Sequence, residues 1–320
     1  MTIRSTSKLR CEFEKTSPEL FFSLVDYRNN LFTSNETEKI IEFYTGFDNR
    51  DQLIQWMKER PKGVSYIHEV EGDKDIIVVI PTADFNGKYA INCRENIFKG
   101  LHMIFVESGG KDDIYFNYAH NCNVGIKKAM EYNPKWIALS NDDMIGVDPV
   151  QLLRTKLMNV NPEEYKIVFT RPSKYHSIPT CVAERGLLDK IIVSVIRRKK
   201  IYKTIDLLDA KFNVKFRQQK KIPLVAKNPI YFTLVSDFAI LSSALCQEYY
   251  GYIFDETYIN AYEDLDLSLR LRNQKNKTID YKINDLFGST LGNNECRMLR
   301  SFAGVVLLNY KLVFNRLRSQ

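Results

Sequence analysis

The chain alternates between short apolar runs and polar, turn-forming stretches. Runs at 76–80, 102–106 and 136–139 are mostly apolar, and each is followed by proline, amide or acidic residues. Short apolar runs bounded in this way are typical of strands buried inside a parallel sheet. The pattern therefore predicts three buried strands in this part of the chain.

Helical spacing separates the second of these runs from the third. Cys122, Ile126, Ala129 and Met130 fall on one face of a helix that Asn133-Pro134 would end. Strands that alternate with helices favour right-handed crossovers in a mainly parallel sheet. We therefore expect an α/β, Rossmann-like fold with helices flanking the sheet.

The order of elements continues downstream. A helix is expected past Asp148-Pro149, a strand at 167–170 and another strand at 231–241. These elements would extend the same sheet.

The stretch 263–272 fits two periodicities. Its alternating leucines suit a half-buried strand, but the same leucines pair across one helical turn. Acids at its start and arginines at its end suit the helix dipole, and Asp266 and Arg270 have the spacing of an ion pair within a helix. We interpret the stretch as a helix with Glu263 and Asp264 at its N-terminus.

Residues 1–70 resemble a separate helical extension suited to packing or to partner binding. Ser34 or Asn35 would cap one helix, and Asn49 would cap a second helix that stops at Pro61-Lys62-Gly63. No candidate chemistry stands out in this extension.

The central domain would span 71–290 and include a segment at 183–222 that is rich in lysine and arginine. Such a segment is a solvated face or a surface that faces an acceptor or a membrane. The tail, 291–320, is expected to form a basic amphipathic helix, with polar or small residues at 297, 300, 304, 311, 315 and 318 opposite an apolar face. Docking onto the domain is favoured over lying on an anionic membrane.

Composition narrows the class of protein only slightly. The 320 residues, 44% hydrophobic and 27% charged, suit a globular chain with a large core. The 46 Lys and Arg against 39 Asp and Glu give a net charge of +7, which fits anionic partners such as nucleotides. Six scattered cysteines favour a reduced, intracellular protein. The chain contains no apolar run long enough for a membrane span, and its start lacks the apolar core of a signal peptide.

Acidic residues after the predicted strands are the first candidate chemistry. The run at 136–139 stops at Asn141-Asp142-Asp143. Adjacent carboxylates repel each other unless a cation compensates them, and Mg²⁺ or Mn²⁺ takes oxygen ligands together with substrate phosphates. A water-exposed turn is the alternative. Because strand ends meet in one crevice of such a sheet, we favour a metal site.

Four stretches between residues 74 and 290 carry a family resemblance. They are IIVVIPT, IFVESGGKDD, HNCNVGIKKAMEYNPKWIALSNDD and YGYIFDETYINAYEDLDLSLRLR. The last two are the specific ones, since an Asn-x-Gly helix leads into an Asn-Asp-Asp strand end and a YED-x-DL-x-x-RLR segment follows. Together they resemble GT-A glycosyltransferases of the family 2 type, particularly the rhamnosyltransferase-like members.

The resemblance implies a nucleotide-sugar site at the strand ends. Its lining would comprise Pro81, Thr82, Glu107, Asn141, Asp142 and Asp143. Asp143 would bind Mn²⁺ or Mg²⁺, Asp142 would lie nearer the ribose, and Glu107 would contact the base or ribose where the family usually has aspartate.

The resemblance also implies the catalytic residues. Asp264 would be the general base of an inverting transfer, with Glu263 beside it, and Asp255 and Glu256 would shape the acceptor side. A carboxylate in a partly dehydrated pocket can act as a base because its pKa can be tuned upward. The alternative for either member of the acidic pair is a helix cap.

Two departures from the family pattern, and one further histidine, bear on these roles. The family often has a histidine near the metal after the acidic helix, but the corresponding stretch, 282–289, has none. Asp285 or Asn284 would substitute as an oxygen ligand, or that ligand is absent. Asp237 stands where a small residue is common, and His176 lies in a loop that could reach the crevice.

The prediction is therefore a metal-dependent, inverting glycosyltransferase. It would move a sugar from a nucleotide-diphosphate sugar to a hydroxyl of a glycan or lipid-linked acceptor, in the cytoplasm and with peripheral membrane contact. One rival is a sugar-phosphate nucleotidyltransferase, although 82–87 is a poor phosphate loop. A catalytically silent nucleotide- or glycan-binding relative is a second rival. Nucleic-acid binding is disfavoured, because the charge is modest and no stacking motif accompanies the basic run.

Overall fold

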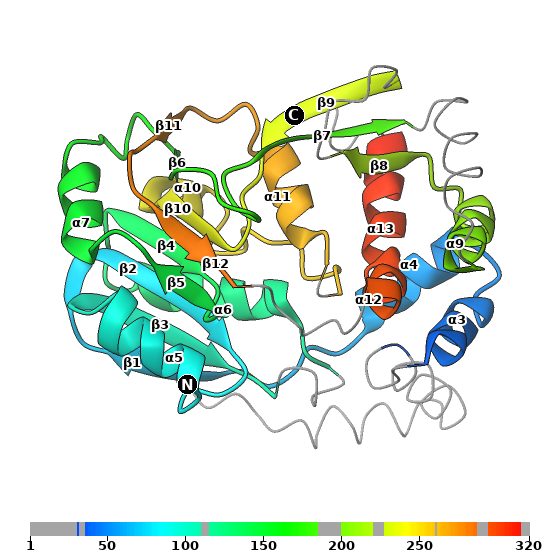
Figure 1. Ribbon diagram of the computed structural model, residues 1–320, viewed down its shortest axis with the longest axis horizontal. Coiled ribbons are helices and arrows are strands. Elements are labelled where there is room, and N and C mark those ends of the chain that lie inside the picture. Colours follow the sequence, from blue (N-terminus) through cyan, green and yellow to red (C-terminus); the bar gives the residue numbers. More distant parts are fainter. Residues whose placement is uncertain are drawn as a thin grey trace.

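A twisted sheet and a group of helices lie side by side in the computed structural model, which describes residues 31, 36–109, 115–184, 200–219, 227–259, 261–286 and 294–314 (Figure 1). The helices away from the sheet are α3 (Thr37–Thr45), α4 (Arg50–Glu59), α9 (Lys200–Lys211), α12 (Asn294–Arg300) and α13 (Phe302–Val313). Segments from both ends of the described chain therefore meet beside the sheet.

The sheet has seven strands. Their spatial order is β1 (Tyr66–Val70), β3 (Leu101–Glu107), β2 (Asp73–Thr82), β4 (Trp136–Ser140), β10 (Phe238–Ser242), β6 (Ile167–Phe169) and β11 (Asn276–Thr278). Only β1 and β10 run against the direction of the others. The predicted α/β class with a mainly parallel sheet is confirmed, and so are the three strands expected at 76–80, 102–106 and 136–139.

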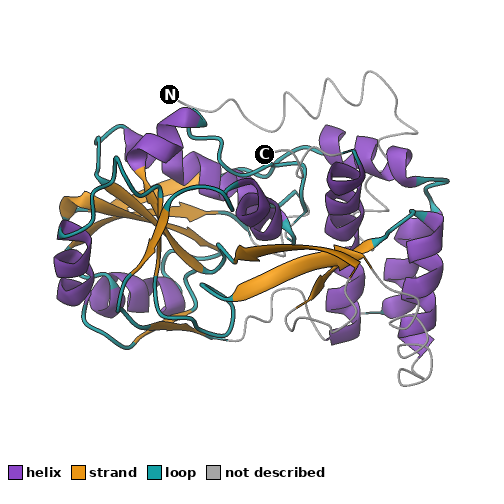
Figure 2. Ribbon diagram, turned by 90° about the horizontal axis from the view of Figure 1, so that it is seen from above, coloured by secondary structure: helices purple, strands orange, loops and turns teal. Residues whose placement is uncertain are grey.

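Alternating residues of β2 bury both faces of the sheet. Ile76, Val78 and Ile80 join a core under α5 (Lys88–Asn92), the π-helical turn η1 (Cys93–Ile97) and α7 (Val150–Met158). Ile77 and Val79 join a second core under α6 (Tyr118–Met130) and α10 (Ser243–Glu248). Figure 2 shows helices on both sides of the strands. A strand buried on both faces is continuously apolar, as its sequence indicated.

The strand expected at 231–241 is two strands in two sheets. β9 (Lys227–Thr233) pairs with β7 (Pro179–Glu184), which also pairs with β8 (Phe216–Gln219), in a small antiparallel sheet. The chain enters the large sheet only at β10. The linking residues 234–237 do not continue either strand. Val235 N donates to Ser268 Oγ at 2.8 Å, and Asp237 O accepts from Asn141 N at 2.9 Å.

The N-terminal helices are not a separate unit. Side chains of α3 and α4 share one apolar core with α9, α12, α13 and the helix α11 (Glu263–Arg270). Asn49 caps α4 as predicted, accepting from the amides of Asp51 and Gln52. The boundary expected for the helical extension, residue 70, was wrong, because β1 belongs to the edge of the sheet. Ser34, Asn35 and residues 1–30 lie outside the described residues.

The C-terminal segment forms two helices, and its predicted solvent face was wrong. Arg300 and Gly304 are buried, and Lys311 forms an ion pair with the buried Asp266 at 2.6 Å. Because these positions face inward, α13 packs into the protein as the docking interpretation expected. Within the described ranges, no helix is long and apolar enough to cross a membrane. Residues 315–320 and parts of the 183–222 segment lie outside those ranges.

Gly304 sets how closely α13 approaches the turn that precedes α11. A Cβ on Gly304 would lie 2.3 Å from the carbonyl oxygen of Ala261, a backbone atom that cannot turn aside. We expect Gly304→Ala to lower the free energy of unfolding by about 1–3 kcal/mol, in spite of the better helix propensity of alanine. Urea unfolding measures this. The matched control is Gly146→Ala, where a Cβ would meet ordinary contacts at 3.5 Å or more; equal effects of the two changes would contradict this account.

Candidate active site

The Asn-Asp-Asp segment follows β4 at the carboxyl edge of the sheet. Asp142 Oδ2 accepts a hydrogen bond from Thr82 Oγ1 at 2.7 Å. Asn141 accepts from Tyr118 Oη through its side chain at 2.7 Å and donates its backbone N–H to Asp237 O. The end of β2, the end of β4 and the start of β10 therefore meet at one point, and two predicted site residues, Thr82 and Asp142, are in contact.

A short ladder brings a distant part of the chain beside Asp143. β5 (Met144–Gly146) pairs antiparallel with β12 (Ile283–Asp285), which sets Asp285 opposite Met144. Leu286 N then donates to Asp143 O at 3.0 Å. The sequence predicted both acids as metal ligands, and this ladder makes them neighbours.

Asp143 is less compensated than its neighbours Asp142 and Asp285. Burial, followed by the charges of Asp142 and Asp285, raises its pKa to about 6, and its own backbone N–H and Arg297 offset part of that rise. In the described part of the chain, no side chain is found that donates a hydrogen bond to it. A carboxylate in this state gains most from a nearby cation, so Asp143 fits the predicted role of metal ligand.

Asp285 is held by protein donors on both of its oxygens. Its side chain is fully buried; His176 Nδ1 lies 2.6 Å from Oδ1, while the Ser173 hydroxyl and Tyr175 N donate to Oδ2, the latter at 3.1 Å. Burial alone would raise its pKa, but the bonds from His176 and Ser173 outweigh burial and hold the pKa below its usual range. His176 thus contacts a predicted site residue, although its own side chain is fully buried.

These contacts bear on how a metal would be held. Mg²⁺ and Mn²⁺ are commonly bound by one or two carboxylates together with substrate phosphates. Within the described residues no group of three or more His, Cys, Asp or Glu is assembled for a metal ion. Asp143 fits such an open arrangement, with Asp142 beside it. Direct ligation by Asp285 stays a prediction, and it would require one of the three hydrogen bonds to Asp285 to be given up.

The acidic pair opens α11 as predicted. The preceding residue, Tyr262, has φ = 73°, a left-handed conformation that is costly for a non-glycine residue and persists only where the surroundings impose it. The close contact of α13 with this turn supplies that constraint. Asp264 Oδ2 accepts from Ser236 Oγ at 2.8 Å, and Asp264 stays partly exposed to the crevice.

Electrostatics separates the two members of the pair. Burial raises the pKa of Glu263, which is only 7% exposed, and the charges of Asp264, Asp237 and Asp266 raise it further. Burial also raises the pKa of Asp264, but the hydrogen bond from Ser236 opposes that rise. At neutral pH the partly exposed Asp264 is therefore the better candidate for an ionised base.

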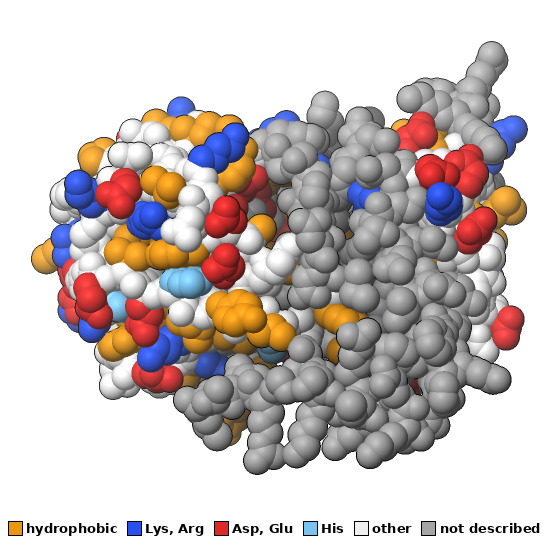
Figure 3. Space-filling view, turned by 90° about the horizontal axis from the view of Figure 1, so that it is seen from below, with side chains coloured by type: hydrophobic (Ala, Val, Ile, Leu, Met, Phe, Trp, Pro, Cys, Tyr) orange, Lys and Arg blue, Asp and Glu red, His pale blue; other side chains and the backbone are white. Residues whose placement is uncertain are grey.

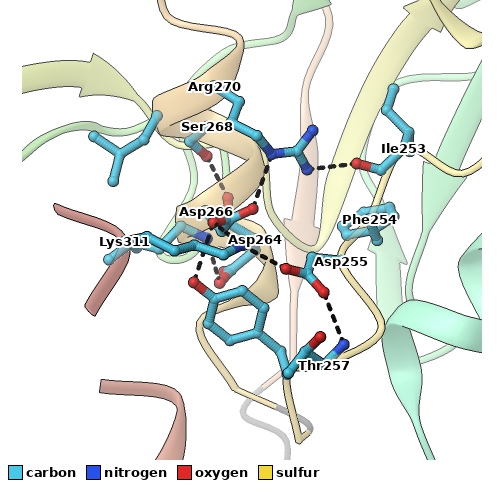
Figure 4. A network of polar contacts seen from close by, with 12 residues as sticks. Ile253, Phe254, Asp255, Thr257, Asp264, Asp266, Ser268, Arg270 and Lys311 are labelled. Atoms are coloured by element: carbon cyan, nitrogen blue, oxygen red, sulfur yellow. Dashed lines mark hydrogen bonds and ion pairs between the residues drawn. The ribbon is translucent and has the colours of Figure 1, made fainter. Parts of the chain in front are cut away.

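A network behind the acidic pair fixes α11 (Figure 4). Asp266 accepts from Arg270 Nε at 2.9 Å, which confirms the predicted ion pair, and from Tyr258 Oη at 3.1 Å. Lys311 of α13 lies 2.6 Å from carboxylate oxygens of both Asp266 and Asp255. Asp255 is therefore part of a structural clamp.

Glu256 is similarly occupied. Its oxygens accept from Asn123 Nδ2 at 2.9 Å and lie 3.0 Å from His120 Nδ1. Asn123 also donates to Phe254 O, so the Asn-x-Gly helix holds the loop before α11 in place. The resemblance assigned Asp255 and Glu256 to the acceptor side, whereas their contacts here position that loop.

Glu107 has a partner that the sequence did not indicate. His68 Nε2, on the neighbouring edge strand, lies 2.5 Å from Glu107 Oε2, and the His68 ring stacks on Phe85 at 4.3 Å between centroids. Glu107 remains partly exposed at the end of β3, next to the Pro81–Thr82 end of β2. Such contacts between strands can be recognised only once strand order is known.

Comparisons with known proteins do not indicate a function, so any functional proposal rests on the geometry of the site. No protein-family model matches the chain, and no curated protein matches it.

Lys311 provides a test of the clamp. Burial raises the pKa of Asp255, but Lys311 and Thr257 outweigh it and hold the pKa low. A depressed pKa contributes stability above the unfolded pKa of about 4, which is lost as the pH falls through the folded value. We expect Lys311→Met to lower stability at pH 7 by about 1–3 kcal/mol.

The difference from wild type should shrink as the pH falls from about 4 through the lower pKa that Asp255 has in the folded wild-type protein, because Asp255 is protonated in both proteins only below that value. Denaturant unfolding at a series of pH values measures it. Lys99→Met, at an exposed position, is the control. A loss of stability independent of pH would rule out the ion pair as its cause.

Proposed function

We propose that this protein is a metal-dependent glycosyltransferase of the GT-A type, moving a sugar from a nucleotide-diphosphate sugar to a hydroxyl with inversion. One observation carries the proposal: the Asp142–Asp143 strand end and Asp264 lie on either side of Asp237, at the carboxyl edge of a mainly parallel sheet. Ligands of open α/β sheets bind at this edge.

The donor side supports a nucleotide-sugar. Asp143, with Asp142 beside it, would hold Mg²⁺ or Mn²⁺ through the diphosphate; when bound, that cation stabilises the charge of the leaving group. The Thr82 hydroxyl fixes Asp142 by donating to its Oδ2. Arg297 lies near enough to lower the pKa of Asp143 and would add positive charge beside the phosphates.

The acceptor side supports a single base. An inverting transfer needs a carboxylate that removes a proton from the attacking hydroxyl on the face opposite the leaving group. Asp264 has a raised pKa, is partly exposed and is oriented by Ser236 and by the amide of Leu265 at 2.7 Å. The acceptor would be a glycan or a lipid-linked glycan.

A second candidate is a catalytically silent relative that binds a nucleotide or glycan. The full engagement of Asp285 by His176, Ser173 and Tyr175 favours it, because one expected ligand position is occupied by protein donors. A nucleic-acid role gains no support from Figure 3, where acidic and basic side chains intermingle on the described part of that face.

Donor binding tests the proposal. We expect one of UDP-, GDP- and dTDP-linked hexoses to raise the melting temperature with Mn²⁺ or Mg²⁺ but not with EDTA, since binding stabilises the folded state. Asp143→Asn should weaken this binding about tenfold or more, because charge-assisted metal ligation is lost. The control is Asp148→Asn, which removes a carboxylate on the other side of β5 from Asp143. A response to no donor with either metal would overturn the proposal.

A further inference from the structure

Ser236 stands between two carboxylates. Its Oγ lies 2.8 Å from Asp264 Oδ2 and 3.0 Å from Asp237 Oδ1. A hydroxyl has one hydrogen to donate and can also accept. Both contacts are therefore fully satisfied when one of the two carboxyl groups carries a proton and donates it to Ser236 Oγ. The geometry is that of a chain along which one proton can move.

Other acidic groups surround the hydrogen-bonded series Asp237–Ser236–Asp264. Glu263 faces it from α11, Asp285 from β12 and Tyr118 from α6, since each of these groups interacts electrostatically with Asp237 or Asp264. Among the described residues, no lysine, arginine or histidine forms an ion pair with Asp237 or Asp264. Without a cation, a proton that reaches one of the two carboxylates relieves the repulsion between them.

Asp237 is suited to receive that proton. Burial, followed by the charges of Asp285 and Asp264, raises its pKa to about 6, so it is ionised at neutral pH yet a stronger base than an ordinary aspartate. Its backbone is fixed at the start of β10 by the bond from Asn141. Asp237 and Ser236 are both partly exposed.

We propose that Ser236 and Asp237 form a proton relay that removes the accepted proton from the general base Asp264 during sugar transfer. This inference rests on the proposed function. As the acceptor oxygen bonds to the sugar carbon and the bond from that carbon to the diphosphate breaks, the acceptor proton passes to Asp264. Asp264 then gives a proton to Ser236 Oγ while the Ser236 hydroxyl proton moves to Asp237. Asp264 is left ionised, and Asp237 carries the proton until solvent removes it.

The relay explains the acid at position 237. A small neutral residue there would leave Asp264 as an isolated base, whose proton would leave only through the occupied acceptor pocket. Glu263 cannot replace Asp237 in this role, since the Ser236 hydroxyl contacts the carboxylates of Asp237 and Asp264, whereas Glu263 Oε2 has no partner in the described residues. Ser236 and Asp237 act through Asp264 and are therefore positioning residues.

Two substitutions separate a relay from a structural role, because they move the pH profile in opposite directions. Ser236→Ala removes a hydrogen bond that lowers the pKa of Asp264, so the ascending limb of kcat should move to higher pH. Asp237→Asn removes a like charge, so the limb should move to lower pH. Both should lower kcat by about tenfold to a hundredfold, with donor affinity unchanged.

Turnover would be followed with whichever of the UDP-, GDP- and dTDP-hexoses the enzyme transfers or hydrolyses. Ser236→Thr keeps the hydroxyl and should restore both kcat and the profile. A wild-type profile in Ser236→Ala and Asp237→Asn would overturn the relay, and so would shifts of both variants in one direction or a loss of donor binding.

A titration that needs no activity separates failure of the relay from failure of the proposed function. In protein with ¹³C-labelled aspartate, Asp237 and Asp264 should titrate as a coupled pair, and Asp237→Asn should remove the step of Asp237 and lower the apparent pKa of Asp264, which still interacts with Glu263. Independent titration of the two groups contradicts the relay even if sugar transfer is observed. Coupled titration without turnover of any donor contradicts the proposed function, but it still supports a proton shared between Asp237 and Asp264.

Discussion

One backbone hydrogen bond, from Asn141 N to Asp237 O, joins the two halves of the candidate site. It extends the antiparallel pairing of β4 with β10, the strand inserted against the direction of its neighbours. Through it, the Asp142–Asp143 strand end is fixed relative to Ser236, and Ser236 is bonded in turn to Asp264. The metal-binding and base functions proposed for these acids both depend on this hydrogen bond between β4 and the start of β10.

The site concentrates negative charge, and the protein compensates its acids unequally. Asp142 receives the Thr82 hydroxyl, Asp264 the Ser236 hydroxyl, and Asp285 the His176–Ser173 pair. Asp143 has no comparable donor among the described residues. This inequality, more than the spacing of the acids, indicates where a cation would bind.

The supports of the site come from distant parts of the chain. The Tyr262 turn is held by α13, and α11 is held by Lys311 from the same helix. The N-terminal helices share the core that keeps α13 in place. The helices beside the sheet therefore fix the base, whereas the sheet itself fixes the donor side.

Sequence periodicity predicted what is local. Buried strands read as apolar runs, and Asn49, Asp266 and Arg270 follow helix rules that need only neighbouring residues. The pairing of β5 with β12 is not visible in this way, because it joins segments that share no local pattern.

Errors in prediction arose where tertiary contacts override a pattern. The apolar stretch at 231–241 was divided between two sheets by bonds to Ser268 and Asn141. Gly304 and Lys311 read as a polar helix face, yet one accommodates a backbone carbonyl and the other neutralises buried aspartates. Ser236, the partner of Asp264, carries no sequence signal of its own, whereas the loop position of His176 did mark it as a candidate.

The most direct test of the account is sugar turnover by Asp264→Asn, measured beside donor affinity in the same protein. The account predicts that the donor and metal bind as in wild type while turnover falls by at least a hundredfold, since only the base is removed. Turnover equal to that of the wild-type protein would contradict the assignment of the base and, with it, the proposed reaction.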